Sequence, residues 1–122
     1  MALGKRYEIY LPFEYNPDEH GNRLRIEEEK FDQTYEELWQ EFRGITLSPE
    51  SENQALRGFW LNESDQLFKD KVLTVMVYAT DINKADRFFR QALNLYKERF
   101  QQEAILILSW SSKELNNLTV VN

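Results

Sequence analysis

Hydrophobic residues recur along this chain with two different periods, one typical of strands and one typical of helices. From Arg6 to Phe13 apolar and polar residues alternate, which predicts a strand with one buried face. Around Glu27–Arg43 the apolar residues are spaced by three and four, which predicts a helix with one buried stripe. Both patterns return in the second half of the chain. The expected elements are strand Arg6–Phe13, helix near Glu27–Arg43, strand Phe59–Leu61, strand Val72–Ala79, helix near Asn83–Gln102 and strand Ala104–Trp110.

This order of elements predicts an α+β fold of the ferredoxin-like class, a β-α-β-β-α-β sandwich. Its sheet is antiparallel with four strands, and two helices cover one face. Ile45–Leu47 and residues 66–68 are expected to add short β segments, the second as the returning arm of a hairpin. Asp81 or Asn83 is expected to cap the second helix, and Gly44 to end the first in a left-handed conformation.

The composition limits which classes of protein this chain can belong to. At this length, residues 1–122 are expected to form a single domain with a core of its own. Cysteine is absent, which excludes disulfides, thiolate catalysis and cysteine-ligated zinc. The N-terminus lacks the apolar segment of a signal peptide, and no apolar run approaches the roughly 20 residues that span a bilayer. We therefore expect a soluble, cytoplasmic protein that makes no membrane contact.

The net charge of −6 disfavours nucleic-acid binding, which requires cations that neutralise phosphates. The charge is distributed unevenly, because acidic residues dominate Glu14–Glu52 and basic residues dominate Lys84–Arg99. The simpler interpretation is that an acidic first helix and a basic second helix complement each other on the sheet. The alternative is that the basic helix contacts an acidic partner or RNA.

No group of residues has the spacing that catalysis or metal binding requires. His20 is the single histidine, and it lies beside Asp18 and Glu19 in a turn-forming segment, where a flexible loop fixes no ligand geometry. The acidic run Glu27–Glu29 points in three directions around a helix, so its carboxylates do not converge. We therefore predict no catalytic residues, no metal ion and no cofactor.

The candidate binding residues lie on the face of the sheet opposite the helices. Tyr10 and Tyr78 fall on that side of two strands expected to be neighbours, and Met76 shares it. If Trp60 lies there too, with Trp110 as a further aromatic residue, the open face carries a partly apolar patch. Such a patch most often meets another subunit. The alternatives are cover by the chain's own loops or tail, a small-molecule pocket, or a base-stacking surface.

Four segments of the chain have a recognisable pattern: Lys5–Pro12, Phe31–Leu38, Gly58–Trp60 and Tyr96–Ile105. They resemble a family of short bacterial proteins of uncharacterised function. Together these segments are spread over most of the chain. The resemblance implies a ferredoxin-like fold and a bacterial origin, and it brings no established catalytic residues to this sequence.

Three classes of function are compatible with these observations. The first is a small non-enzymatic protein that self-associates as a homodimer and regulates or binds a protein partner. The second is a small-molecule-binding protein, or a cofactor-independent enzyme, with a pocket on the open sheet face where Glu8, Tyr10 and Tyr78 supply polar groups. The third is a nucleic-acid-linked role through the basic second helix. We adopt the first as the leading hypothesis.

Overall fold

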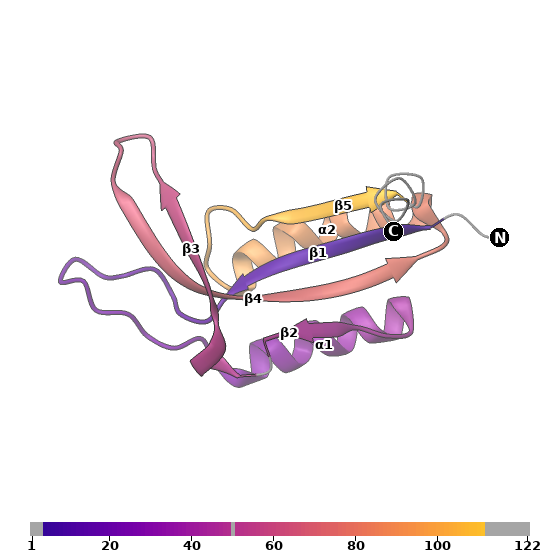
Figure 1. Ribbon diagram of the computed structural model, residues 1–122, viewed down its shortest axis with the longest axis horizontal. Coiled ribbons are helices and arrows are strands. Elements are labelled where there is room, and N and C mark those ends of the chain that lie inside the picture. The colour runs from indigo at the N-terminus through magenta and orange to yellow at the C-terminus, as the bar shows by residue number, and fades with distance from the viewer. Residues whose placement is uncertain (1–3, 50, 112–122) are drawn as a thin grey trace, which may run out of the picture.

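In the computed structural model, which describes residues 4–49 and 51–111, five antiparallel strands form one sheet accompanied by two helices (Figure 1). The predicted α+β class is therefore confirmed. In chain order the elements are β1 (Lys5–Pro12), α1 (Glu28–Phe42), β2 (Thr46–Ser48), the short 3-10 helix η1 (Glu52–Gln54), β3 (Leu56–Leu61), β4 (Leu67–Ala79), α2 (Ile82–Arg99) and β5 (Ile107–Ser111). The expectation of four strands is wrong, because the segment between α1 and β4 makes two separate strands.

The long strand β4 organises the sheet because it has different partners along its two edges. Its second half, Val72–Ala79, pairs with β1 on one edge. On the other edge, Leu67–Val72 pair with β3, and β2 follows at Thr74–Met76. β5 lies beyond β1, so the strand order is β2-β4-β1-β5, with β3 also beside β4. The sequence therefore predicts the strand at Val72–Ala79 correctly, but it does not predict that the strand begins at Leu67.

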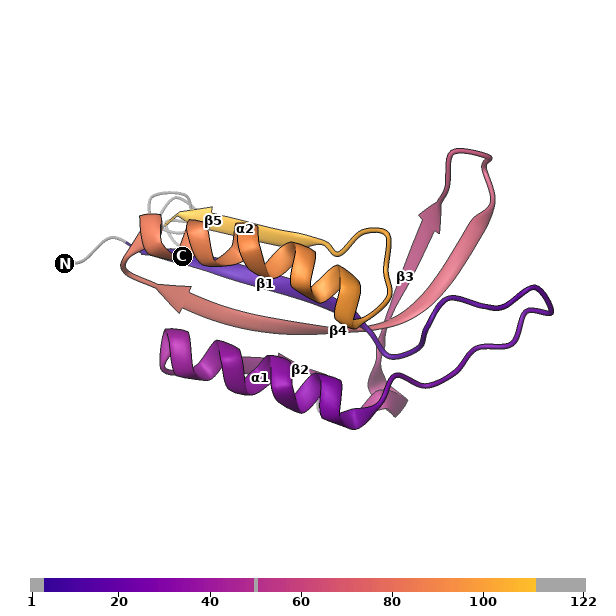
Figure 2. The same cartoon turned by 180° about the vertical axis from the view of Figure 1, so that it is seen from behind.

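Both helices lie on one face of the sheet, which Figure 2 shows from the side that they occupy. Alternate residues of β1 and β4 point toward the helices, and Ile9 and Val75 are fully buried there. From α1, Phe31 and Leu38 are buried against the same layer. Removal of these side chains from water is the main stabilising term of the fold. The core consists of Tyr7, Ile9, Leu11, Phe13, Ile26, Phe31, Leu38, Leu73, Val75, Val77, Ala79, Ala85, Phe89, Ala92, Tyr96, Phe100 and Ile105.

The ends of the helices follow the sequence signals only in part. Asp81 caps α2 as expected, since its carboxylate accepts a hydrogen bond from the backbone N–H of Lys84 at 3.1 Å. At the end of α1 the left-handed residue is Arg43, with a φ of 70°, and not Gly44. The Arg43 N–H donates to the Trp39 carbonyl at 2.8 Å and closes the last turn. Neither helix of the described residues is long and apolar enough to cross a membrane.

The last strand begins later than the sequence predicts. β5 starts at Ile107 rather than at Ala104, because the chain first turns back from the end of α2. Ile105 is buried in this connection, whereas Leu106 is 41% exposed. The apolar run before β5 is therefore covered only in part.

One hairpin extends beyond both helices (Figure 1). It consists of β3, the turn at residues 62–66 and Leu67–Lys71 of β4, and we call it the arm. The loop of residues 14–25 runs beside it. In that loop Arg23 donates hydrogen bonds to the Lys69 carbonyl at 2.9 Å and to Asp70 at 2.7 Å. No helix of the described residues covers the arm, so its side chains are more exposed than those of the rest of the sheet.

Candidate functional site

The four residues predicted for binding do not form one group. Tyr10, Met76 and Tyr78 lie on the open face of the sheet, on the paired strands β1 and β4. Trp60 lies in the arm, opposite Phe68. From Phe68 to Met76 is eight residues of β4, which at about 3.3 Å per residue separates them by roughly 26 Å. The predicted patch is therefore divided between the open face and the arm.

At the centre of the open face, Glu8 accepts hydrogen bonds from two residues of its own strand. Arg6 donates through Nη2 to Oε1 at 2.5 Å, and Tyr10 donates through its hydroxyl to Oε2 at 2.7 Å. The bond to Glu8 raises the pKa of Tyr10 above its ordinary value. Arg6 Nη2 also lies 2.9 Å from the Met76 sulfur, and the guanidinium lies 5.9 Å from the centre of the Trp110 ring. These polar groups therefore hold one another in place.

In this network the polar groups of Glu8 are already engaged, so they are poorly placed to bind a ligand or to take part in a reaction. Both oxygens of Glu8 accept a hydrogen bond, and its side chain is 13% exposed. Nearby on the same face, Val72 and Thr74 are only 5% and 6% exposed. The middle of the open face therefore offers less accessible apolar surface than the sequence predicts.

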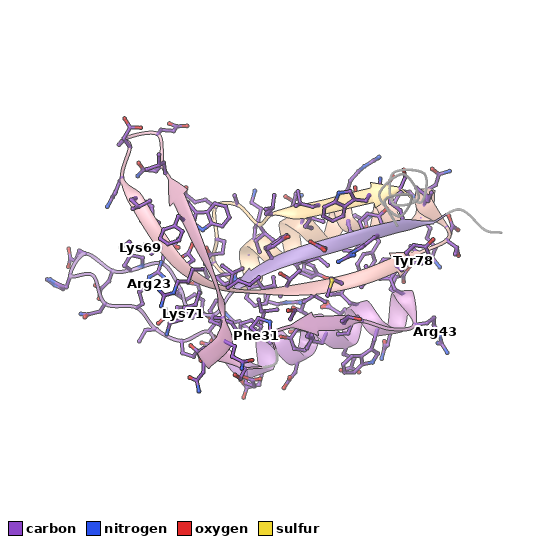
Figure 3. The ribbon with its side chains drawn as sticks, viewed as in Figure 1. Arg23, Phe31, Arg43, Lys69, Lys71 and Tyr78 are labelled. Atoms are coloured by element: carbon purple, nitrogen blue, oxygen red, sulfur yellow. The ribbon has the colours of Figure 1, made fainter. Side chains whose placement is uncertain are left out.

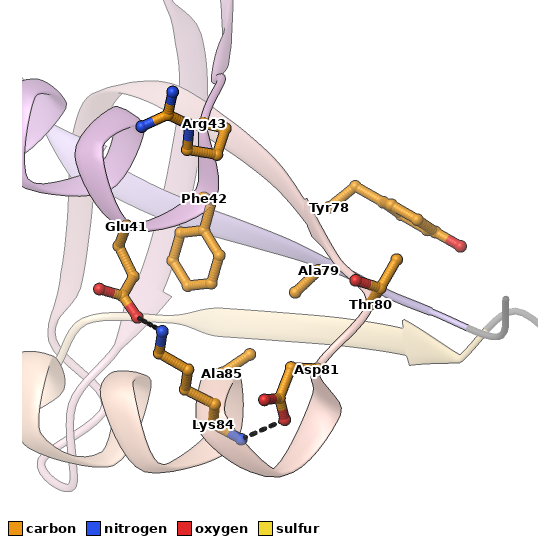
Figure 4. Close-up of a pocket in the computed structure, with 9 residues that line it drawn as sticks. All are labelled: Glu41, Phe42, Arg43, Tyr78, Ala79, Thr80, Asp81, Lys84 and Ala85. Carbon is orange, nitrogen blue, oxygen red and sulfur yellow. Dashed lines mark hydrogen bonds and ion pairs between the residues drawn. The ribbon is translucent and has the colours of Figure 1, made fainter.

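A cavity of about 320 Å³ lies between the end of α1 and the start of α2 (Figure 4). Three of its charged side chains, Glu41, Asp81 and Lys84, already take part in contacts. Lys84 Nζ lies 3.6 Å from Glu41 Oε1 and links the two helices, and Asp81 is engaged in the cap of α2. Arg43 and Tyr78 are among the residues that line this cavity. These contacts favour a crevice of the packing over a ligand site.

A second cavity, of about 550 Å³, lies at the same end of the sheet. Its lining includes two arginines, Arg6 and Arg43, together with Met76 and Tyr78. Ligand pockets of this size combine apolar walls with a few polar groups that orient the ligand. Arg6 is already paired with Glu8, so Arg43 is the arginine that a small anion with an apolar body would meet here.

The opposite charges of the two helices meet between them. Arg99 of α2 donates hydrogen bonds to the Glu37 carboxylate of α1 at 2.5 and 3.0 Å, and to the Thr34 hydroxyl at 2.7 Å. The Arg99 side chain is 8% exposed. Together with the pair of Lys84 and Glu41, these contacts favour the simpler interpretation of the charge distribution, in which the helices complement each other.

The segment around the histidine forms a turn. Asp18 Oδ1 accepts hydrogen bonds from the backbone N–H of His20 at 2.8 Å and of Asn22 at 2.9 Å. The His20 side chain is 75% exposed, and Glu19 lies 3.6 Å from it. Within residues 4–49 and 51–111, no group of three or more His, Cys, Asp or Glu residues is placed to hold a metal ion.

The arm exposes a dense group of large apolar side chains. On one face, Phe59 is 58% exposed, Leu61 67% and Leu67 52%. On the other face, Leu56 is 45% exposed and Trp60 43%. Large apolar patches that stay exposed in a folded domain mark binding surfaces. The arm is therefore the strongest candidate for a functional site.

The register of β3 and β4 sorts the side chains of the arm onto two faces. The directly opposed pairs on one face are Arg57–Lys71, Phe59–Lys69 and Leu61–Leu67. We call these six residues the basic face. In the part of the chain that the structure describes, no carboxylate oxygen lies within 4.0 Å of the side-chain nitrogens of Arg57, Lys69 or Lys71. Figure 3 shows Lys69 and Lys71 at the arm, far from Tyr78 at the other end of β4.

The two edges of the arm differ in cover. On the β4 edge, the Lys71 carbonyl accepts a hydrogen bond from the Phe13 N–H at 2.9 Å, and the Lys69 carbonyl accepts one from Arg23. On the β3 edge, the described residues supply no further strand. An unpaired strand edge is a template for pairing with another chain.

The backbone geometry shows which residues of β3 present their polar groups at this edge. Asn62 donates its N–H to the Gln66 carbonyl at 3.1 Å. Hydrogen-bonded pairs alternate along an antiparallel ladder, so every second residue before Asn62 points its N–H and C=O at β4. The residues between them, Arg57, Phe59 and Leu61, point these groups away from β4.

Sequence reasoning placed Trp60 in the candidate site but missed the basic face. A signal was present, because basic and apolar residues alternate in residues 57–61 and again in residues 67–71. Whether those two alternating sets share a face depends on the register of the hairpin, and a slip of one residue would separate them.

Comparison with protein-family models, with curated proteins and with solved structures finds no match for this chain. The resemblance to short bacterial proteins stays a prediction. Function is therefore inferred from the geometry of the arm and of the open face.

Proposed function

We propose that this chain is a non-enzymatic, partner-binding protein that docks through the arm. The observation that carries the proposal is the exposure of Phe59, Leu61 and Leu67, between 52% and 67%, on a hairpin that neither helix covers. Burial of such side chains in an interface is favourable by roughly 25 cal/mol per Å² of apolar surface. A partner that covers the arm supplies the burial that the fold itself does not.

The remaining candidate sites support binding rather than catalysis. The Glu8 carboxylate accepts hydrogen bonds from Arg6 and Tyr10, and the raised pKa of Tyr10 keeps its hydroxyl protonated and weakly nucleophilic. In the cavity between the helix ends, Lys84 is paired with Glu41. The hydrogen bonds of Glu8 and the pair of Lys84 and Glu41 therefore serve to stabilise the fold.

A second candidate function is the binding of a small anion. It is favoured by the cavity of about 550 Å³ that Arg6 and Arg43 line. Titration with a set of aromatic carboxylates, followed by NMR shifts of the Arg43 backbone amide, tests it. Unchanged shifts at millimolar concentrations would exclude this class of ligand.

We also infer that the sandwich is related to the ferredoxin-like class, with β2 and β3 in succession along one edge of β4. The order of helices and strands, and the position of both helices on one face, support this relation. Self-association as a homodimer and a cytoplasmic location stay predictions. Light scattering at micromolar concentrations tests the first.

Photocrosslinking in cells that make the protein tests the docking surface. Phe59 is replaced by benzoylphenylalanine, which keeps an aromatic ring at this exposed position. The matched control carries the same group in place of Leu95, which is 47% exposed on α2. We expect defined adducts from position 59 that position 95 does not give, and that form again with the purified partner.

Two results would contradict the proposal. The first is the absence of adducts from position 59. The second is the same set of adducts from positions 59 and 95, which would mean that the arm has no preference over an ordinary exposed surface.

A further inference from the structure

We infer that the partner of the arm is an extended acidic segment of another protein, which adds to the outer edge of β3 as a further antiparallel strand and places its carboxylates on the basic face. This inference rests on the proposed function and names the class of partner. Three features of the arm support it: cations that no carboxylate of the described residues pairs with, a strand edge that no described strand covers, and the alternation of its side chains.

The cations of the basic face lie close enough together to repel one another. Arg57 lies directly opposite Lys71, and like charges at opposed positions of two strands are destabilising. Lys69 is the next residue of β4 on the same face. All three are exposed, and no carboxylate of the described residues pairs with them, although the chain carries a net charge of −6. An acidic partner relieves this repulsion.

The backbone of β3 sets the geometry of the added strand. Arg57, Phe59 and Leu61 present their N–H and C=O groups at the outer edge, which an extended segment can pair by strand addition. Residues that are directly opposed in a ladder project to the same face. In an antiparallel added strand the residues that exchange hydrogen bonds are directly opposed, so the partner residues that hydrogen-bond to β3 also point onto the basic face, where acidic side chains meet the cations.

The other face of the arm fits the intervening residues of such a segment. Leu56 and Trp60 are 45% and 43% exposed there. Trp60 lies over Gly58, where an added Cβ would be 2.8 Å from the ring. The glycine thus lets the indole lie flat along the strand, as an apolar surface. A partner that alternates acidic and apolar residues satisfies both faces at once.

A second copy of the chain and an RNA strand fit this edge less well. Antiparallel pairing of β3 with itself brings three cations from each copy onto one continuous face. RNA neutralises cations, but it has no peptide backbone to pair with the strand edge. Phe59 is also the single aromatic residue of the basic face, whereas single-strand binders stack successive bases on several rings.

Fluorescence anisotropy with a defined peptide tests the inference. The probe alternates glutamate and valine over roughly eight residues, enough to span β3. We expect saturable binding that weakens with salt.

Lys69→Glu/Lys71→Glu should weaken the binding of this peptide by roughly tenfold or more, because each exchange replaces an attraction with a repulsion. Arg87→Glu/Arg90→Glu makes the same change of net charge at exposed positions of α2 and should leave the affinity unchanged. Circular dichroism checks that both variants are folded.

Two N-methylated peptides separate strand addition from a purely electrostatic contact. They have the same charge and the same side chains, and differ only in which N–H groups are blocked. Methylation at the glutamates removes the N–H groups that face β3 and should abolish binding. Methylation at the valines blocks N–H groups that point away from β3 and should leave binding nearly intact.

If the two methylated peptides lose binding equally, or keep it equally, strand addition is overturned. Absence of binding by the unmodified probe would overturn the inference. So would tighter binding of an oligouridylate that Lys69→Glu/Lys71→Glu abolishes, or a dimer that the probe does not dissociate. Adducts at position 59 together with failure of the peptide would leave the proposed function standing, whereas failure of both experiments would remove it as well.

Discussion

One strand, β4, passes through two different environments. Its second half, Val72–Ala79, lies in the sheet and is mostly buried, whereas its first half, Leu67–Lys71, lies in the arm and is mostly exposed. Apolar side chains occur in both halves. Only the second half has helices packed on one of its faces. The comparison shows that an apolar and polar pattern predicts a strand, but does not predict what covers it.

The two halves of β4 also differ in whether their apolar side chains stabilise the fold or remain available for binding. Apolar side chains in the covered half are buried on folding and stabilise the fold. Those of the arm stay in contact with water after folding, so they contribute little to the free energy of unfolding. Substitutions of similar chemistry in the two regions should therefore have very different effects.

The largest effect is expected from Leu38→Ala in the covered region. Leu38 is 0% exposed beneath the sheet, and its truncation should lower the free energy of unfolding by about 2–5 kcal/mol. Urea denaturation measures the change. Leu95→Ala, the same substitution at a site that is 47% exposed, serves as control and should change it by less than about 1 kcal/mol. A loss below about 1 kcal/mol for Leu38→Ala would mean that α1 does not pack on the sheet as described.

The next largest loss of stability is expected at the polar contact between α1 and α2. Arg99→Ala removes the hydrogen bonds to Glu37 and Thr34 and should cost about 1–3 kcal/mol, since the Arg99 side chain is 8% exposed. Arg90→Ala, at an exposed position of the same helix, should cost much less. Equal costs in thermal or urea unfolding would show that the contact between the helices is not specific.

A smaller effect should appear as a dependence of stability on pH. Hydrogen bonds from Tyr7 and then from Lys5 hold the pKa of Asp86 below its ordinary value. A carboxylate with a depressed pKa stabilises the fold above its unfolded pKa of about 3.9, and this contribution is lost as the pH falls through the folded value. Asp86→Asn should therefore cost about 1 kcal/mol at pH 7, and less as the pH falls below about 4. A cost that stays constant from pH 7 to pH 3 would contradict this account.

Periodicity predicts much of the covered region. The expected helix near Glu27–Arg43 agrees with α1 at Glu28–Phe42 to within one residue at each end, because an acidic run marks its start, an apolar stripe its body and Gly44 its end. The stretch between α1 and β4 is different. There the expected β segments Ile45–Leu47 and Phe59–Leu61 lie close to β2 at Thr46–Ser48 and β3 at Leu56–Leu61. Their bounds and their pairing with β4 depend on tertiary contacts that local sequence does not encode.

The candidate site is predicted less well than the fold. Tyr10, Met76 and Tyr78 share one face, as expected, because alternation along paired strands fixes the face of each residue. Trp60 belongs to the arm because β4 is longer than its most apolar segment suggests. The basic face depends on the hairpin register, which no single residue determines.

Within the arm, Gly58→Ala should move a side chain with little loss of stability. A Cβ at this position would lie 2.8 Å from Trp60 Cζ2, so the ring must shift. The NMR signal of the Trp60 indole N–H should move clearly, while the free energy of unfolding should fall by less than about 1 kcal/mol. Gly44→Ala, where a Cβ meets nothing within 4 Å, provides the control. An unshifted Trp60 signal would mean that the indole does not lie over Gly58.

The central claim is that the exposed apolar residues of the arm serve docking and not folding. The free energy of unfolding of Phe59→Ser/Leu61→Ser/Leu67→Ser, measured in urea, tests it most directly. Since these side chains are already 52–67% exposed, we predict a value within about 1 kcal/mol of the unmodified protein. A loss of several kcal/mol, comparable with that of Leu38→Ala, would show that the arm is part of the core and would contradict the account.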